Sequence, residues 1–116
     1  MKENVIADKS RSFAIRIVNL YKFLTEEKKE FVLSKQLLRS GTSIGANVKE
    51  AVHACSKNDF INKMTISLKE AGETEYWLDL LHETNFLTNR QFDSIMSDCN
   101  ELIKILTAIV KSARND

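Results

Sequence analysis

The sequence predicts an all-α protein, an antiparallel up-down-up-down four-helix bundle made by residues 1–116 as a single domain. The chain has 116 residues, no proline and three glycines, so it lacks the turn residues that an all-β domain needs. Four stretches place apolar residues three or four positions apart, which is the spacing of one face of an α-helix. Short polar segments separate these stretches, and short connections make consecutive helices antiparallel.

The first predicted helix has an apolar stripe at Phe13, Ile17, Leu20 and Leu24. Asp8 or Ser10 is expected to cap its start, because a short polar side chain can accept a hydrogen bond from the free N–H groups of the first turn.

The second predicted helix covers residues 28–56. Its core side is marked by Leu37, Gly41, Ile44, Val48, Val52 and Cys55. Each glycine inside a helix costs about 1 kcal/mol relative to alanine, so a break near Gly41 is the alternative. Because the stripe keeps its register through Gly41 and Gly45, we expect one continuous helix whose small residues let another helix approach closely.

The third and fourth helices have the longest apolar stripes. The third is expected over residues 59–83 with Asn58 as its cap, and its stripe is Phe60, Met64, Ser67, Ala71, Thr74, Leu78 and Leu81. The fourth begins at Thr88, which forms the pattern of a capping box with Gln91. Its stripe is Phe92, Ile95, Cys99, Leu102, Leu106, Ile109 and Ala113.

The second and third helices each carry a further organised stripe. These stripes are Gln36, Ser40, Ser43, Asn47, Glu50 and Ala54 on one helix, and Ile66, Glu70, Glu73, Trp77 and Leu80 on the other. Folding the pair about residue 58 puts Asn47 beside Lys69 and Glu70, Ser43 beside Glu73, and Ser40 near Trp77. A monomeric bundle needs one apolar face per helix, so the second face predicts burial against another subunit. The alternative is that Trp77 and Leu80 widen the bundle core.

The charge is balanced overall but unevenly distributed. Seventeen basic and 16 acidic residues give a net charge of +1, too small to imply nucleic-acid binding by itself. Residues 1–24 carry five basic and two acidic groups, whereas residues 59–87 carry two and six. The candidate phosphate contacts are Arg11, Arg16, Lys22, Lys35 and Lys49. They form a solvated surface in one protomer, but in a symmetric ring such contacts repeat and binding becomes multivalent.

No chemistry-bearing cluster emerges from the histidines or cysteines. Glu50 and His53 have the spacing of a di-metal ligand pair in ferritin-like bundles, but His82 is expected roughly 28 Å further along the bundle. Cys55 and Cys99 lie on core stripes and are expected to be buried, reduced thiols about 18 Å apart. His53 points away from Cys55, so no nucleophile–base pair forms.

The carboxylates Glu50, Glu70 and Glu73 are the remaining candidates for acid–base chemistry. We expect them instead to form a structural network with Arg39, Ser43, Asn47 and Lys69. The sequence therefore predicts no catalytic residue, cofactor, metal or small-molecule substrate. No apolar run approaches the ~20 residues of a membrane span, and residues 1–12 lack a signal-peptide core, so a cytoplasmic protein with no membrane partner is expected.

Three segments have a distinctive composition. They are residues 36–51 (QLLRSGTSIGANVKEA), Ser56 to Phe60 followed by Lys63, and residues 66–78 (ISLKEAGETEYWL). Together they resemble the bacterial four-helix-bundle family of 23S rRNA-intervening-sequence proteins, over nearly the whole chain. The resemblance implies an up-down bundle that assembles as a homopentamer. Its signature positions here are Arg39, Ser43, Asn47, Glu50, Lys69, Glu70 and Glu73.

The resemblance also bears on function. A similar pentameric bundle is an accessory protein of diversity-generating retroelements and binds nucleic acid, although the present chain is nearly neutral. The expected function is a non-enzymatic oligomer that binds RNA or DNA weakly. The alternative is a scaffold module that binds only proteins, with its basic half paired to an acidic neighbour.

Overall fold

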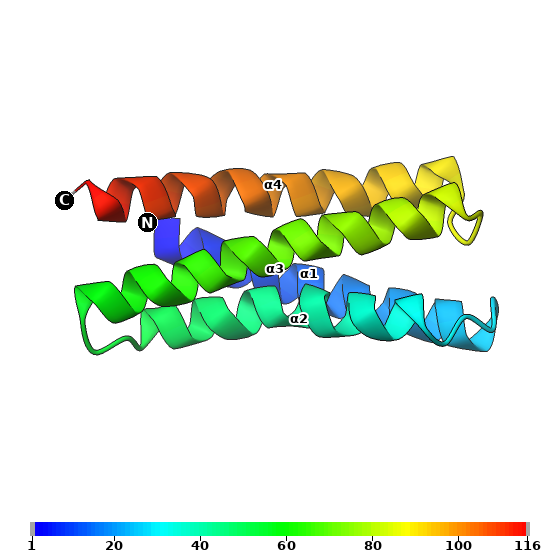
Figure 1. The fold of residues 1–116 in the computed structure, drawn as a ribbon, viewed down its shortest axis with the longest axis horizontal. Coiled ribbons are helices and arrows are strands. Elements are labelled where there is room, and N and C mark those ends of the chain that lie inside the picture. The colour runs from blue at the N-terminus through cyan, green and yellow to red at the C-terminus, as the bar shows by residue number, and fades with distance from the viewer. Residues whose placement is uncertain (1, 116) are drawn as a thin grey trace.

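The computed structural model describes residues 2–115, and this part of the chain forms four α-helices and no strand. They are α1 (Lys2–Glu26), α2 (Leu33–Val52), α3 (Lys57–Glu83) and α4 (Asn89–Arg114). Both chain ends and the α2–α3 turn lie at one end of the bundle, and the other two turns lie at the opposite end (Figure 1). Helices consecutive in sequence pack together, and α1 packs on α4. The diagonal pairs, α1 with α3 and α2 with α4, make no backbone contact within residues 2–115.

The predicted stripes form the core. Its fully buried large side chains include Phe13 and Ile17 of α1, Leu37 and Ile44 of α2, and residues of both later helices, namely Met64, Leu78, Leu81, Leu102 and Leu106. The core side of α2 ends earlier than predicted. Val52 is 50% exposed and Cys55 is exposed, because the helix stops at Val52 and the chain turns toward α3. Both cysteines were predicted to be buried: the prediction is confirmed for Cys99 and wrong for Cys55.

The starts of α1, α2 and α3 differ from the sequence-based prediction, whereas the start of α4 agrees with it. Helix α1 already begins at Lys2, so Asp8 and Ser10 lie inside it, and the Ser10 hydroxyl donates to the Ala7 carbonyl instead of capping. Helix α3 is capped by Ser56 rather than Asn58, since the Ser56 hydroxyl accepts from the Asp59 N–H. The capping box of α4 is confirmed in both its hydrogen bonds.

Helix α2 begins at Leu33, not near residue 28, because Glu30 caps it. Glu30 is 9% exposed, and its carboxylate accepts hydrogen bonds from the backbone N–H groups of Val32, Leu33 and Ser34 at 3.2, 2.9 and 2.7 Å. Burial opposes ionisation of this carboxyl, but the bonds from the Leu33, Ser34 and Val32 N–H groups outweigh it and lower its pKa. A charged group therefore satisfies the free N–H groups at the helix start. Sequence reasoning missed this role.

Helix α2 runs unbroken through Gly41 and Gly45, as predicted. A Cβ atom at Gly41 would lie 2.8 Å from Cγ1 of Ile17, and one at Gly45 would lie 3.3 Å from the carbonyl oxygen of Ser10. The two glycines thus let α1 approach α2 closely. Gly72, in contrast, faces open space.

Candidate functional site

An ion-pair network joins α2 to α3 on one face of the bundle. Arg39 of α2 pairs with Glu70 at 3.2 Å and also pairs with Glu73 of α3. The Trp77 indole donates to the same Glu73 carboxylate at 3.1 Å. Sequence reasoning identified all four of these residues. A second ion pair, between Lys63 and Glu50 at 3.1 Å, continues the line toward the α2–α3 turn.

The two carboxylates of this network differ in their electrostatics. Burial and a hydrogen bond with Glu73 raise the pKa of Glu70, although the Arg39 charge partly offsets this. The hydrogen bond from Arg39 lowers the pKa of Glu73, burial opposes this, and the bond from Trp77 adds to the lowering. One guanidinium thus holds two neighbouring acids, and we interpret the arrangement as a clamp between helices.

Other members of the predicted network turn inward or bond within their own helix. The Ser43 hydroxyl donates to the Arg39 carbonyl at 2.7 Å, and the Asn47 amide donates to the Ser43 carbonyl at 2.8 Å. Ser40 is buried and accepts from Thr74 at 2.9 Å, one helical turn before Trp77, its predicted neighbour. Lys69 is exposed.

The apolar members of the second α3 stripe divide between core and surface. Trp77 packs against the core cluster, which was the alternative considered for it. Ile66 and Leu80 are half-buried. The second stripe therefore still presents partly exposed apolar side chains beside the ion pairs.

An apolar patch continues this face toward the α1–α2 turn. Val32 precedes Arg39 by seven residues and Leu80 follows Glu73 by seven, which is about two helical turns in each case. Since Arg39 contacts Glu73 and the helices are antiparallel, Val32 lies level with Leu80. The most exposed large apolar side chains near this level are Val32 (72%), Phe31 (60%) and Tyr76 (56%). Sequence reasoning missed Phe31 and Val32 because they were assigned to the interior of a helix.

The five predicted phosphate contacts separate onto different faces. Arg11 of α1 and Lys49 of α2 line one groove of about 460 Å³ between these helices, together with His53. Asp8 is the acidic residue among the groove's lining residues, and the floor contains small side chains such as Ala46. Lys22 and Lys35 are exposed.

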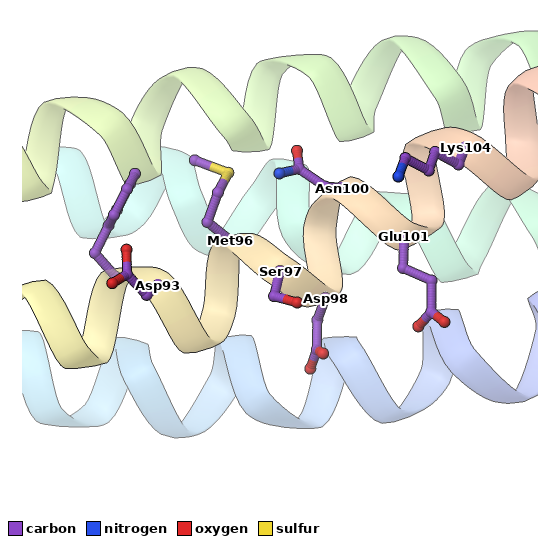
Figure 2. Close-up of a pocket in the computed structure, with 8 residues that line it drawn as sticks. Asp93, Met96, Ser97, Asp98, Asn100, Glu101 and Lys104 are labelled. Atoms are coloured by element: carbon purple, nitrogen blue, oxygen red, sulfur yellow. The ribbon is translucent and has the colours of Figure 1, made fainter.

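Arg16 lies on the other side of α1, where α4 neutralises it. Its guanidinium pairs with Asp98 at 2.6 Å and donates to the Ser94 hydroxyl at 3.0 Å. Lys9 makes the matching pair with Glu101 at 3.2 Å. In Figure 2, Asp98 and Glu101 point from α4 toward α1, whereas Asn100 points away from α1. The residues drawn in Figure 2 line a depression on the protein surface. All of them come from α4, so the depression is shallow.

The two histidines lie far apart. His53 lines the α1–α2 groove, whereas His82, near the end of α3, stacks on Phe92 with a centroid separation of 4.1 Å and contacts Asn89 at 2.6 Å. Among the side chains of residues 4–115, no group of three or more histidines, cysteines or acids could hold a metal ion. None of the helices in this part of the chain is long and apolar enough to cross a membrane.

The comparisons with known proteins decide the family. The model of the 23S rRNA-intervening sequence protein family matches residues 2–108. The chain belongs to this family. Among solved structures, a protein from Bacteroides thetaiotaomicron, described as a protein with unknown function from the S23 ribosomal protein family, is 62% identical and superposes with a TM-score of 0.94. That match covers 96% of the present chain and 99% of the other. The comparison with curated proteins finds no match.

Proposed function

We propose that this 23S rRNA-intervening sequence protein is a non-enzymatic, self-assembling bundle that binds structured RNA or DNA weakly through its α1–α2 groove. The observation that carries the proposal is the convergence of Arg11 and Lys49 from two helices onto one groove with His53. Guanidinium and ammonium groups on a groove that tracks two helices suit phosphate contacts, which need no base recognition.

Further cations extend this basic surface along the same two helices. The close approach of Gly41 to Ile17 sets the level of α2 against α1. Lys22 follows Ile17 by five residues and Lys35 precedes Gly41 by six, so both exposed lysines lie at nearly the same height. The cations therefore recur along the length of the bundle at a spacing that suits phosphates several nucleotides apart.

Self-assembly would multiply these contacts. We propose that copies of the chain associate through the α2–α3 face, with five subunits favoured. The exposed apolar side chains Phe31, Val32 and Tyr76, which lie from the Arg39 clamp toward the α1–α2 turn, support this surface, because exposed apolar groups that gather on one face are typical of subunit contacts. A ring with several copies of the groove binds a long polyanion more tightly than one copy does.

The proposal is tested by fluorescence anisotropy with a duplex DNA and a structured RNA at two salt concentrations. The variant Arg11→Glu/Lys49→Glu reverses the charge of the groove, and Lys104→Glu/Lys111→Glu is the matched control because both lysines are exposed on α4. We expect binding that falls steeply with salt, disappears in the groove variant and persists in the control. Equal affinity of the two variants for nucleic acid would refute binding through the α1–α2 groove.

The second candidate function is a scaffold that binds only proteins. It is favoured by the pairs that neutralise Arg16 and Lys9 within the chain, since these cations are then less available to phosphates. It predicts no nucleic-acid binding even at low salt.

Assembly is tested separately with Val32→Asp, directly before α2, for which Val52→Asp at the other end of that helix is the control. Both valines are at least half exposed, so neither substitution removes core packing. A lower mass in solution for Val32→Asp alone would support the α2–α3 face. An unchanged mass for both variants would contradict its use in assembly.

A further inference from the structure

The contact between α1 and α4 is the sparsest of the four helix contacts, and a cleft of about 470 Å³ opens in it. The cleft lies toward the end of the bundle that carries the α1–α2 and α3–α4 turns (Figure 1), since its residues come from the last part of α1 and the first part of α4. Ligand pockets are typically about 300–1,000 Å³. The cleft is therefore large enough for one small organic molecule.

Two arginines face this cleft from opposite helices. Arg16 comes from α1 and Arg90 from α4, and no acidic residue is among the lining side chains. Asp98 and Ser94 hold Arg16 in place, and the Asp98 carboxylate also neutralises part of its charge. Arg90 is exposed, and it makes no ion pair or side-chain hydrogen bond with residues 4–115, whose side chains the structure describes. The cleft thus combines one positioned guanidinium with one that is available to a ligand.

The remaining lining supplies an apolar floor and amide groups. Leu20, Phe23 and Ile95 form the apolar part, and Ile95 is almost completely buried. The amides are those of Asn19 and Gln91. The carbonyl oxygen of the Gln91 amide already accepts from the Thr88 N–H at 2.9 Å, so its NH₂ group remains to donate.

We propose that this cleft binds a nucleotide, with the phosphate on Arg90 and Arg16 and the base over the apolar floor. Guanidinium groups suit phosphate oxygens because their N–H donors form bidentate bonds. Side-chain amides match the edges of bases, and apolar and aromatic side chains accept their faces. The nucleotide is either free or the phosphorylated end of a strand. The site is separate from the α1–α2 groove and does not depend on duplex binding there.

The experiment is isothermal titration of the full chain with adenosine monophosphate, with adenosine, and with a short single-stranded oligonucleotide with or without a 5′-phosphate. The test variant is Arg90→Gln, which removes a charge without breaking a contact within the described chain. The control is Lys104→Gln, an exposed cation of α4 outside the cleft. Arg16→Gln is the second test variant.

We expect a phosphorylated probe to bind at least tenfold more tightly than its unphosphorylated counterpart. Loss of one charge-assisted hydrogen bond is expected to weaken binding by roughly tenfold or more in Arg90→Gln, with Lys104→Gln unchanged. Binding of the monophosphate indicates a free nucleotide, and binding of the phosphorylated strand alone indicates a strand end. No saturable binding of either probe, or equal affinity of Arg90→Gln and the wild type, would overturn the proposal. The groove variant Arg11→Glu/Lys49→Glu should bind the monophosphate normally, which separates this test from that of the proposed function.

Discussion

Replacing glycine by alanine should have different effects at Gly41 and at Gly72. In both positions alanine gains about 1 kcal/mol of helix stability, because it restricts the unfolded backbone and favours the helix. The added methyl at Gly72 meets nothing within 4 Å. We therefore expect Gly72→Ala to stabilise the fold by about 1 kcal/mol.

At Gly41 the same methyl group meets a packed side chain. It would lie 2.8 and 2.9 Å from Cγ1 and Cγ2 of Ile17. These atoms branch directly from the Ile17 Cβ in a side chain that is 0% exposed, so they have little room to move. Overpacking of this kind costs about 1–3 kcal/mol. After the gain in helix stability, Gly41→Ala should be neutral to about 2 kcal/mol destabilising, which places it about 1–3 kcal/mol below Gly72→Ala.

The assay is urea denaturation followed by circular dichroism, at one fixed protein concentration because assembly would shift the midpoint. For a chain of 116 residues, 1 kcal/mol corresponds to about 4 °C in melting temperature. In an Ile17→Ala background, which removes the clashing atoms, Gly41→Ala should cease to destabilise. If Gly41→Ala is as stable as Gly72→Ala in the wild-type background, the close approach of α1 and α2 is not what constrains residue 41.

Three further predictions concern caps and thiols. Because the folded pKa of Glu30 is lowered, the stability it contributes is present at neutral pH and is lost as the pH falls through that pKa. Glu30→Gln should cost about 1–2 kcal/mol at pH 7. In urea melts, its unfolding free energy should fall less between pH 7 and pH 3 than that of the wild type. Thr88→Ala removes one half of the capping box and should cost about 1 kcal/mol in the same melts, whereas no measurable change would mean that the cap is not contributing. Burial, with a smaller effect of the nearby Glu75 charge, raises the pKa of Cys99 to about 12. A thiol reagent at pH 8 should therefore modify exposed Cys55 in the folded protein and Cys99 only after unfolding. Two fast-reacting thiols in the folded protein would contradict the burial of Cys99.

Local signals account for most of what the sequence predicted correctly. The capping box at Thr88 needs only residues three apart. The continuity of α2 through Gly41 could be predicted because the apolar period is kept on both sides of it. The start of α2 could not be placed in this way, since Glu30 becomes a cap only when the chain reverses at Lys29, whose φ is 54°.

The candidate surfaces were predicted less completely than the fold. The Arg39 clamp was anticipated, because the two helices it joins are consecutive and antiparallel. The pairing of Arg16 with Asp98 joins residues separated by 82 positions. No periodic pattern contains that separation, so this arginine was assigned to the same surface as Arg11.

By itself, the sequence determined the number of helices, their apolar faces and the family to which the chain belongs, because these depend on spacing within short segments. Only the tertiary structure decided which charges are neutralised, which apolar side chains stay exposed and where clefts open. Those properties depend on the azimuth and level at which distant helices meet. Arg11 and Arg16, five residues apart on one helix, illustrate the reason: α2 and α4 pack on different sides of α1, so one side chain lines a groove and the other closes an ion pair.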